Sequence, residues 1–188
     1  EFDLRKEGFL NIAGIDEAGR GPWAGPLVAA AVCIKPKVKI PRIIDSKKIP
    51  AEKRIQIFSL ILKKADFGIG IVTNEEIDKM YLGESIKLAY KRAVTNIKCM
   101  PDYLLIDGIG RYDFKIPYMT VKGGDGKIRC IAAASLVAKV VRDIIMDANS
   151  KKFPNYGFEK HKGYGTKLHQ KKLLEYGVCP LHRQSFGP

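Results

Sequence analysis

The apolar positions along the chain follow two patterns, one typical of strands and one typical of amphipathic helices. Short apolar runs with turn residues at their ends predict strands at about 10–15, 27–34, 67–72, 103–106 and 118–121. Apolar residues at helical spacing, separated by Lys and Glu, predict helices at about 51–65, 74–96, 127–146 and 167–176. Because helices are interleaved with early strands, the pattern predicts a single domain of the α/β or α+β class.

Acidic residues recur where the predicted strands end. Asp16 and Glu17 follow the first strand, Asp107 follows the fourth and Asp125 follows the fifth. Neighbouring residues within a strand point to opposite faces, but a turn just past the strand end can aim both Asp16 and Glu17 toward one cavity. If these strand ends meet at one edge of the sheet, four carboxylates converge there.

Four close carboxylates repel one another unless cations lie between them. Hard divalent cations take oxygen ligands, and Mg²⁺ or Mn²⁺ is the usual choice beside phosphate. Two such ions about 4 Å apart can activate water and stabilise the leaving oxygen of a phosphodiester. This chemistry needs no nucleophilic side chain, in agreement with a sequence that has no convincing Ser-His-Asp arrangement.

Each acid also has a simpler interpretation. Asp125 precedes a predicted helix and could be its N-cap, and Asp107 before a glycine could belong to an ordinary turn. Asp16 and Glu17 are harder to explain in this way, because unpaired acids among apolar neighbours cost free energy.

Charge points to a polyanionic partner. The chain has 33 Lys and Arg against 20 Asp and Glu, a formal net charge of +13, and such an excess favours nucleic acid. A generally basic surface is the alternative. The four cysteines lack the spacing of a disulfide scaffold or a zinc site. No apolar run approaches the roughly 20 residues that span a bilayer, and residues 1–8 lack the apolar stretch of a signal peptide. We therefore expect a cytoplasmic protein without membrane contact, and we also expect a monomer.

Eight motifs resemble, in the same order, those of type 2 ribonucleases H, the family of bacterial ribonuclease HII. They are AGIDEAGRGP from residue 13, DSKK from 45, LIDG from 105, KGGD from 122, IAAASLVAK from 131, RD at 142, HKGYGT from 161 and HRQSFGP from 182. A lone Asp-Glu or Gly-Arg-Gly is weak evidence, whereas this ordered set is very specific and runs from about residue 10 to the last.

The resemblance implies the ribonuclease H-like α/β fold, a mixed five-stranded sheet flanked by helices with a short C-terminal helical segment. Residues 1–188 then form one catalytic domain, in which about 150–188 contact the substrate. It implies that Asp16, Glu17, Asp107 and Asp125 bind two Mg²⁺ or Mn²⁺ ions and catalyse. The implied activity is hydrolysis on the 5′ side of a ribonucleotide in RNA/DNA hybrids and duplex DNA, leaving a 5′-phosphate and a 3′-hydroxyl. Such an enzyme removes misincorporated ribonucleotides and primer remnants.

The resemblance also implies the substrate contacts. The turn formed by Gly19, Arg20 and Gly21 would recognise the ribose 2′-hydroxyl through backbone groups, since this hydroxyl distinguishes RNA from DNA and glycine permits close approach. Tyr164 matches a tyrosine that packs on the sugar of the following deoxynucleotide and so selects an RNA–DNA junction. The remaining substrate contacts implied near the site are Asp45, Ser46, Lys47 and Lys162. A capped turn before a helix is the simpler interpretation of residues 45–47.

Two other functions stay open at this point. Another two-metal nuclease of the same fold, of the resolvase or transposase kind, would need the carboxylates but not the Gly-Arg-Gly turn. A non-catalytic nucleic-acid-binding domain would use only the positive charge, although the intact acidic positions argue against it.

Overall fold

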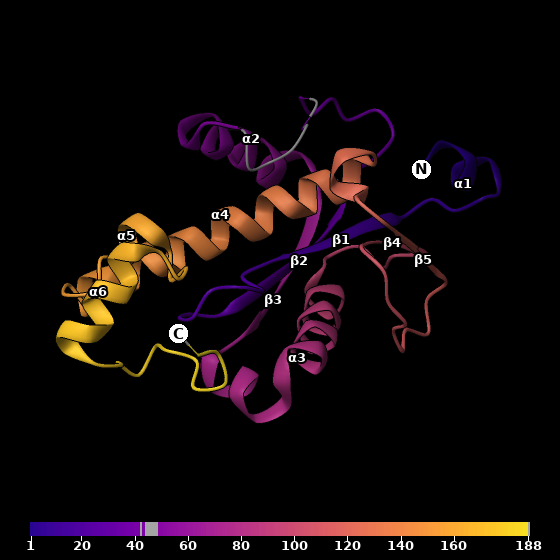
Figure 1. Ribbon diagram of the computed structural model, residues 1–188. Helices are drawn as coiled ribbons and strands as arrows, with labels where there is room; N and C mark the ends of the chain where they lie inside the picture. The colour runs from indigo at the N-terminus through magenta and orange to yellow at the C-terminus, as the bar shows by residue number, and fades with distance from the viewer. Residues whose placement is uncertain (42, 44–48, 188) are drawn as a thin grey trace.

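Five strands form one mixed sheet at the centre of the protein (Figure 1). The computed structural model describes residues 1–41, 43 and 49–187. The strands are β1 Ile12–Ala18, β2 Leu27–Cys33, β3 Asp66–Val72, β4 Tyr103–Asp107 and β5 Tyr118–Val121. Their order is β3-β2-β1-β4-β5, in which β1 and β2 pair antiparallel, as do β2 and β3, while β1–β4 and β4–β5 are parallel pairs. The expected mixed five-stranded sheet is therefore confirmed.

Helices cover both faces of this sheet. They are α1 Phe2–Lys6, α2 Ala51–Lys64, α3 Asn74–Asn96, α4 Arg129–Lys152, α5 Phe158–His161 and α6 Lys167–Tyr176, with a 3-10 turn η1 at Gly124–Gly126. In Figure 1, α4 runs along one face, α3 lies against the other, and α5 and α6 gather at one end. One buried apolar cluster fills the space between the sheet and α3, and another lies between the sheet, α2 and α4.

The residues of strand β1 face α3 and α4 in turn, which explains the composition of the strand. Ala13 and Ile15 belong to the cluster beneath α3, while Gly14 faces α4 and leaves room for the helix backbone. A Cβ atom on Gly14 would lie 2.2 Å from the carbonyl carbon of Cys130. The small buried residues of α4 meet this strand at the same level, so helix and strand pack backbone to backbone.

Element boundaries differ from the sequence prediction at three places near the site. Asp107 was predicted to follow the fourth strand, but it is the last residue of β4. The first strand continues to Ala18 instead of ending at residue 15, because β2 pairs with it as far as Ala18 opposite Val28. The long helix begins at Arg129 and runs to Lys152 rather than spanning 127–146. Its last turn is polar, so the apolar pattern ends before the hydrogen-bonded helix does.

The C-terminal tail, residues 178–187, folds back onto the start of α3 and the loop after β1. The Asn74 amide donates to the carbonyl oxygens of Pro180 and His182 at 2.9 and 3.3 Å. Asp78 accepts hydrogen bonds from the backbone of Gln184 and Ser185. Figure 1 shows the C-terminal tail beside the start of α3, so residues distant in sequence meet at this end of β1.

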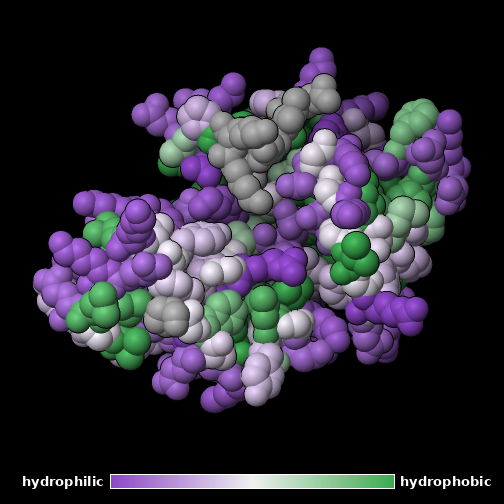
Figure 2. Space-filling view, in the orientation of Figure 1, coloured by the Kyte–Doolittle hydropathy of each residue, from purple (hydrophilic) through white to green (hydrophobic). Residues whose placement is uncertain are grey.

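The surface agrees with the basic composition. The face in Figure 2 is largely hydrophilic, and hydrophobic side chains gather at the end where α6 lies. There Leu174 and Val178 are strongly exposed. Within the described ranges, no helix combines the length and apolar character that a membrane crossing requires.

Candidate active site

Two of the predicted acids lie side by side because of strand register. Parallel strands β1 and β4 place Ile15 opposite Ile106, so Asp16 and Asp107 follow at the same edge of the sheet. The side chain of Asp16 is buried, with the residue only 5% exposed. Glu17 and Asp107 line one hollow together with Arg20 and Tyr112. The structure therefore places three of the four acids at the same edge of the sheet.

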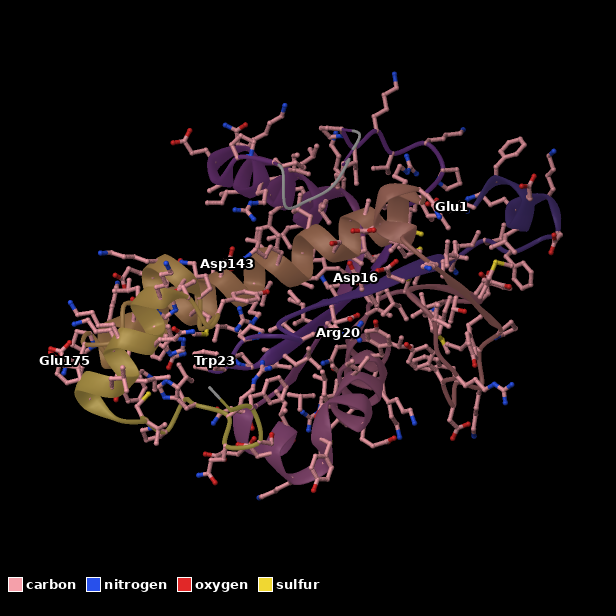
Figure 3. The ribbon with its side chains drawn as sticks, in the orientation of Figure 1. Glu1, Asp16, Arg20, Trp23, Asp143 and Glu175 are labelled. Carbon is pink, nitrogen blue, oxygen red and sulfur yellow. The ribbon has the colours of Figure 1, made fainter. Side chains whose placement is uncertain are left out.

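Asp16 and Glu17 nevertheless contact different layers. We expected a turn to aim both into one cavity, but both belong to β1 and alternate between its faces. Asp16 lies between β1 and α4 (Figure 3), where the Ser135 side chain hydrogen-bonds its carboxyl group. Glu17 lies toward α3, accepts a hydrogen bond from the Tyr90 hydroxyl and pairs with Arg20 at 3.2 Å.

The electrostatics of Asp16 are those of a site suited to a cation. Burial raises the pKa of Asp16 well above its usual range, and the negative charges of Glu17 and Asp107 raise it further. Hydrogen bonds from Ser135 and from the Glu17 amide act in the opposite direction. A divalent cation among these oxygens would favour the ionised form, so the donors and their repulsion fit such an ion.

Asp125 is placed differently. The Gly124 amide donates to Asp107 Oδ1 at 2.6 Å, which brings the turn that carries Asp125 against β4. Asp125 itself lines another hollow, with Ile40 and Arg129 among its neighbours. In the part of the chain that the structure describes, no three His, Cys, Asp or Glu side chains form a group that could hold a metal ion. The four-carboxylate site thus stays a prediction.

A third hollow, of about 350 Å³, joins the Gly-Arg-Gly turn to Tyr164. Gly19, Arg20 and Gly21 line one side of it, and Tyr164, from the loop between α5 and α6, lines another. Glu17 also lines it, together with Ser135 and Lys139 of α4. The two elements assigned to sugar recognition therefore share one hollow next to the acids.

The remaining predicted substrate contacts are less informative. Lys162 does not line this hollow, because its ammonium group is bound to the carboxylate of Asp147 and to the carbonyl oxygen of Glu159. Asp45, Ser46 and Lys47 lie outside the described residues.

Four residues at the site escaped the sequence prediction: Tyr90, Ser135, Arg142 and Arg183. Tyr90 and Ser135 fall within apolar helical patterns, which are typical of core positions. Burial and the charge of Glu17 raise the pKa of Tyr90, so its hydroxyl stays protonated and donates. Ser135 also belongs to a family motif, the one that starts at residue 131, and this was its available signal. The same holds for Arg142 and Arg183, which belong to two other family motifs. Both are almost fully buried, at 1% and 2% exposed.

All three histidines of the chain lie in one buried cluster behind Tyr164. His161 and His169 stack with ring centroids 4.4 Å apart, and the Nε2 atoms of His169 and His182 are 3.0 Å apart. Nδ1 of His169 must donate to the Tyr164 carbonyl oxygen, since a carbonyl only accepts. His169 Nε2 therefore accepts from His182, whose Nδ1 accepts from the Cys179 amide at 2.8 Å. These hydrogen bonds require neutral rings.

We expect this cluster to make the protein unstable toward acid. Burial is the main cause that lowers the pKa of His169 from 6.5 to about 4, and burial also lowers those of His161 and His182. The unfolded chain therefore binds protons first as the pH falls below 6.5, and folding stability decreases through that window. His169 alone should contribute about 2 kcal/mol of this loss by pH 5.

Urea denaturation at pH 7.5, 6.5, 5.8 and 5.0 measures this effect above the range where most carboxylates titrate. His169→Asn should show a shallower loss between pH 6.5 and 5.0 than the parent. Equal stability of the parent at pH 7.5 and 5.0 would contradict the prediction.

The fold and the site are those of the ribonuclease H-like class of nucleases. This class is defined by the order of the strands, the helical layers on both faces of the sheet, and the acids at neighbouring strand ends. The fold is similar to that of the ribonuclease H2 of Pyrococcus horikoshii OT3, with a TM-score of 0.79 and 26% identity over 94% of this chain and 93% of that chain.

Sequence comparison then gives the particular family. Residues 13–187 match the ribonuclease HII family. The chain is 46% identical over 187 residues to the ribonuclease HII of Syntrophotalea carbinolica, covering 99% of this chain and 90% of that protein. It is 48% identical over 181 residues to that of Clostridioides difficile, covering 96% of this chain and 71% of that protein. The chain belongs to the ribonuclease HII family, whose members are metal-dependent endoribonucleases.

Proposed function

We propose that this ribonuclease hydrolyses the phosphodiester on the 5′ side of a ribonucleotide, both in RNA/DNA hybrids and in duplex DNA that contains a single ribonucleotide. The products would carry a 5′-phosphate on the ribonucleotide and a 3′-hydroxyl upstream. One observation carries this proposal: Glu17, next to the buried Asp16, lines the same hollow as the Gly-Arg-Gly turn and Tyr164. Cleavage and sugar recognition can therefore act on adjacent groups of one strand.

Asp16, Glu17, Asp107 and Asp125 would hold two divalent cations, Mg²⁺ or Mn²⁺. When bound, these ions would supply an activated water and stabilise charge on the departing 3′ oxygen. Oxygen ligands and the mutual repulsion around Asp16 support this assignment.

The protein's own groups would orient three of these carboxylates before any metal arrives. Ser135 and the Glu17 amide hold the Asp16 carboxyl group, while the Gly124 amide holds that of Asp107. The Tyr90 hydroxyl and the Arg20 guanidinium hold Glu17. Fixed partners of this kind reduce the reorganisation that binding and catalysis require.

Recognition would divide between sugar and phosphate. Gly19, Arg20 and Gly21 would contact the 2′-hydroxyl, and the Tyr164 ring would pack on the next deoxyribose. Asp45, Ser46, Lys47 and Lys162 would contribute contacts near the phosphates, supported by the net charge of +13. The enzyme would act as a monomer in the cytoplasm and remove misincorporated ribonucleotides and primer remnants.

The decisive measurement is cleavage of a duplex with one ribonucleotide in one strand, in Mg²⁺ or Mn²⁺, with the cut position mapped. We expect a single cut on the 5′ side of the ribonucleotide, none in the matched all-DNA duplex and none in EDTA. Equal cutting of the all-DNA duplex would favour a resolvase-type nuclease. A folded protein that cuts neither duplex would contradict the proposal.

A further inference from the structure

Two buried guanidinium groups hold the loop between β1 and β2, which contains the Gly-Arg-Gly turn. Arg183, from the C-terminal tail, donates to the carbonyl oxygens of Gly19, Arg20 and Gly25 at 2.7, 3.3 and 2.9 Å. Arg142, from α4, donates to those of Ala24 and Pro26 at 3.1 and 3.0 Å. Only Arg183 contacts carbonyl groups of the turn itself.

The carbonyl directions determine where the turn's amides point. In a trans peptide the C=O and the following N–H are antiparallel and share one plane. When Arg183 draws the carbonyl oxygens of Gly19 and Arg20 inward, the N–H groups of Arg20 and Gly21 must point the opposite way. Both residues are exposed, and across residues 1–41, 43 and 49–187 neither amide donates a hydrogen bond within the chain.

Arg183 is itself well fixed. Its amide donates to the Trp23 carbonyl oxygen at 2.7 Å, and its guanidinium lies 4.8 Å from the centroid of the Phe186 ring. Burial and the nearby Arg142 lower the pKa of Arg183 to about 9, so the group still carries its charge at neutral pH. At 2% exposure it cannot reach a substrate.

We propose that Arg183 is a positioning residue for ribose recognition, which orients the amides of Arg20 and Gly21 toward the 2′-hydroxyl by holding the carbonyl oxygens of Gly19 and Arg20. This inference rests on the proposed function, because the turn must face the sugar. It makes the C-terminal tail part of the specificity apparatus, although the tail contributes no group to the hollow.

The test compares Arg183→Lys with Arg5→Lys, the same change at an arginine that also holds backbone carbonyl oxygens. Arg5 donates to those of Leu10 and Ile34 at 2.7 and 3.1 Å, at the end of β1 opposite the turn. Steady-state kinetics on the single-ribonucleotide duplex give kcat/KM, and inhibition by the matched all-DNA duplex gives Ki for the phosphate contacts. For Arg183→Lys we expect kcat/KM to fall about tenfold or more with Ki unchanged, since a hydrogen bond to the hydroxyl is lost or misdirected. For Arg5→Lys we expect a lower Tm but a kcat/KM within about twofold of the parent.

Thermal unfolding followed by circular dichroism gives the temperature below which each variant is folded, and the assays are run below it. Arg183→Gln serves as a second variant at the same position. If Arg183→Lys keeps the parent kcat/KM, or if it loses kcat/KM and duplex affinity together, the positioning role is wrong. If the parent itself fails to distinguish the ribonucleotide duplex from all-DNA, the proposed function fails instead.

A measurement on the parent protein needs no variant. In ¹H–¹⁵N spectra recorded without divalent metal, the Arg20 and Gly21 amide signals should shift when the ribonucleotide duplex is added and shift less with all-DNA. Equal responses to the two duplexes would overturn the inference even if neither Arg183 variant folds.

Discussion

Asp107→Asn is expected to lower metal-dependent cleavage of the single-ribonucleotide duplex by about a thousandfold or more, the loss of several kcal/mol of transition-state stabilisation. The amide keeps the shape of the side chain and can still accept from the Gly124 amide, which bonds Asp107 Oδ1 in the parent. It removes the negative charge that a divalent cation requires beside Asp16. Single-turnover cleavage in Mg²⁺ and in Mn²⁺, with duplex affinity measured separately, tests this expectation.

Asp113→Asn is the matched control, because Asp113 is exposed and lies in the loop after the same strand. It removes the same charge from the protein and should leave cleavage within about twofold of the parent. Full activity of Asp107→Asn would exclude the carboxylate from catalysis. A simultaneous loss of duplex affinity would indicate that the substitution disturbs the fold or the binding surface.

Gly14→Ala is expected to destabilise the protein by about 3 kcal/mol or more, because the new methyl group meets backbone atoms rather than flexible side chains. Its Cβ would lie 2.2 Å from the carbonyl carbon and 2.5 Å from the carbonyl oxygen of Cys130. Strand and helix must separate to accommodate it. Because Asp16 is two residues further along β1 and faces the same helix, its hydrogen bond to Ser135 should weaken as well. Urea denaturation at pH 7.5 measures the loss.

Gly83→Ala provides the control for that measurement. Gly83 lies in α3 just after the kink at Tyr81, where the second part of the helix begins, and a Cβ there has no heavy atom within 4 Å. The same change should be neutral or stabilise by up to about 1 kcal/mol, since alanine favours the helix. If Gly14→Ala is as stable as the parent, α4 does not pack on β1 as closely as described.

Local pattern was enough for the five strands and the four longer helices. It was not enough for the short helices α1 and α5 or for the ends of the elements near the site. The apolar run at 27–34 corresponds to β2, whose seven residues are all buried. Strand β1 was predicted to stop before Asp16, because an acid follows the apolar residues. It continues because β2 supplies backbone partners for Asp16 and Glu17, namely Ala30 and Ala29. A pairing partner from another segment cannot be inferred from the residues of one strand.

The burial of two charged arginine side chains could not be predicted from the pattern of apolar and polar residues either. Arginine is almost never fully buried unless it is paired, and a sequence does not show where five carbonyl oxygens will gather. Arg142 and Arg183 are buried because the loop after β1 turns those oxygens toward them. The histidine cluster has the same origin, since His161, His169 and His182 meet only when the tail folds back.

The sequence by itself determined the class of fold, the acids at the strand ends and the family. The first two follow from the local pattern of apolar and acidic residues, and the family follows from the ordered motifs. Only the tertiary structure decided that β1 lies next to β4, that Asp16 and Glu17 contact opposite layers, and that Asp125 lines a separate hollow. The physical reason is that strand pairing and the burial of charge depend on hydrogen-bond partners from distant segments, and these become neighbours only in the folded chain.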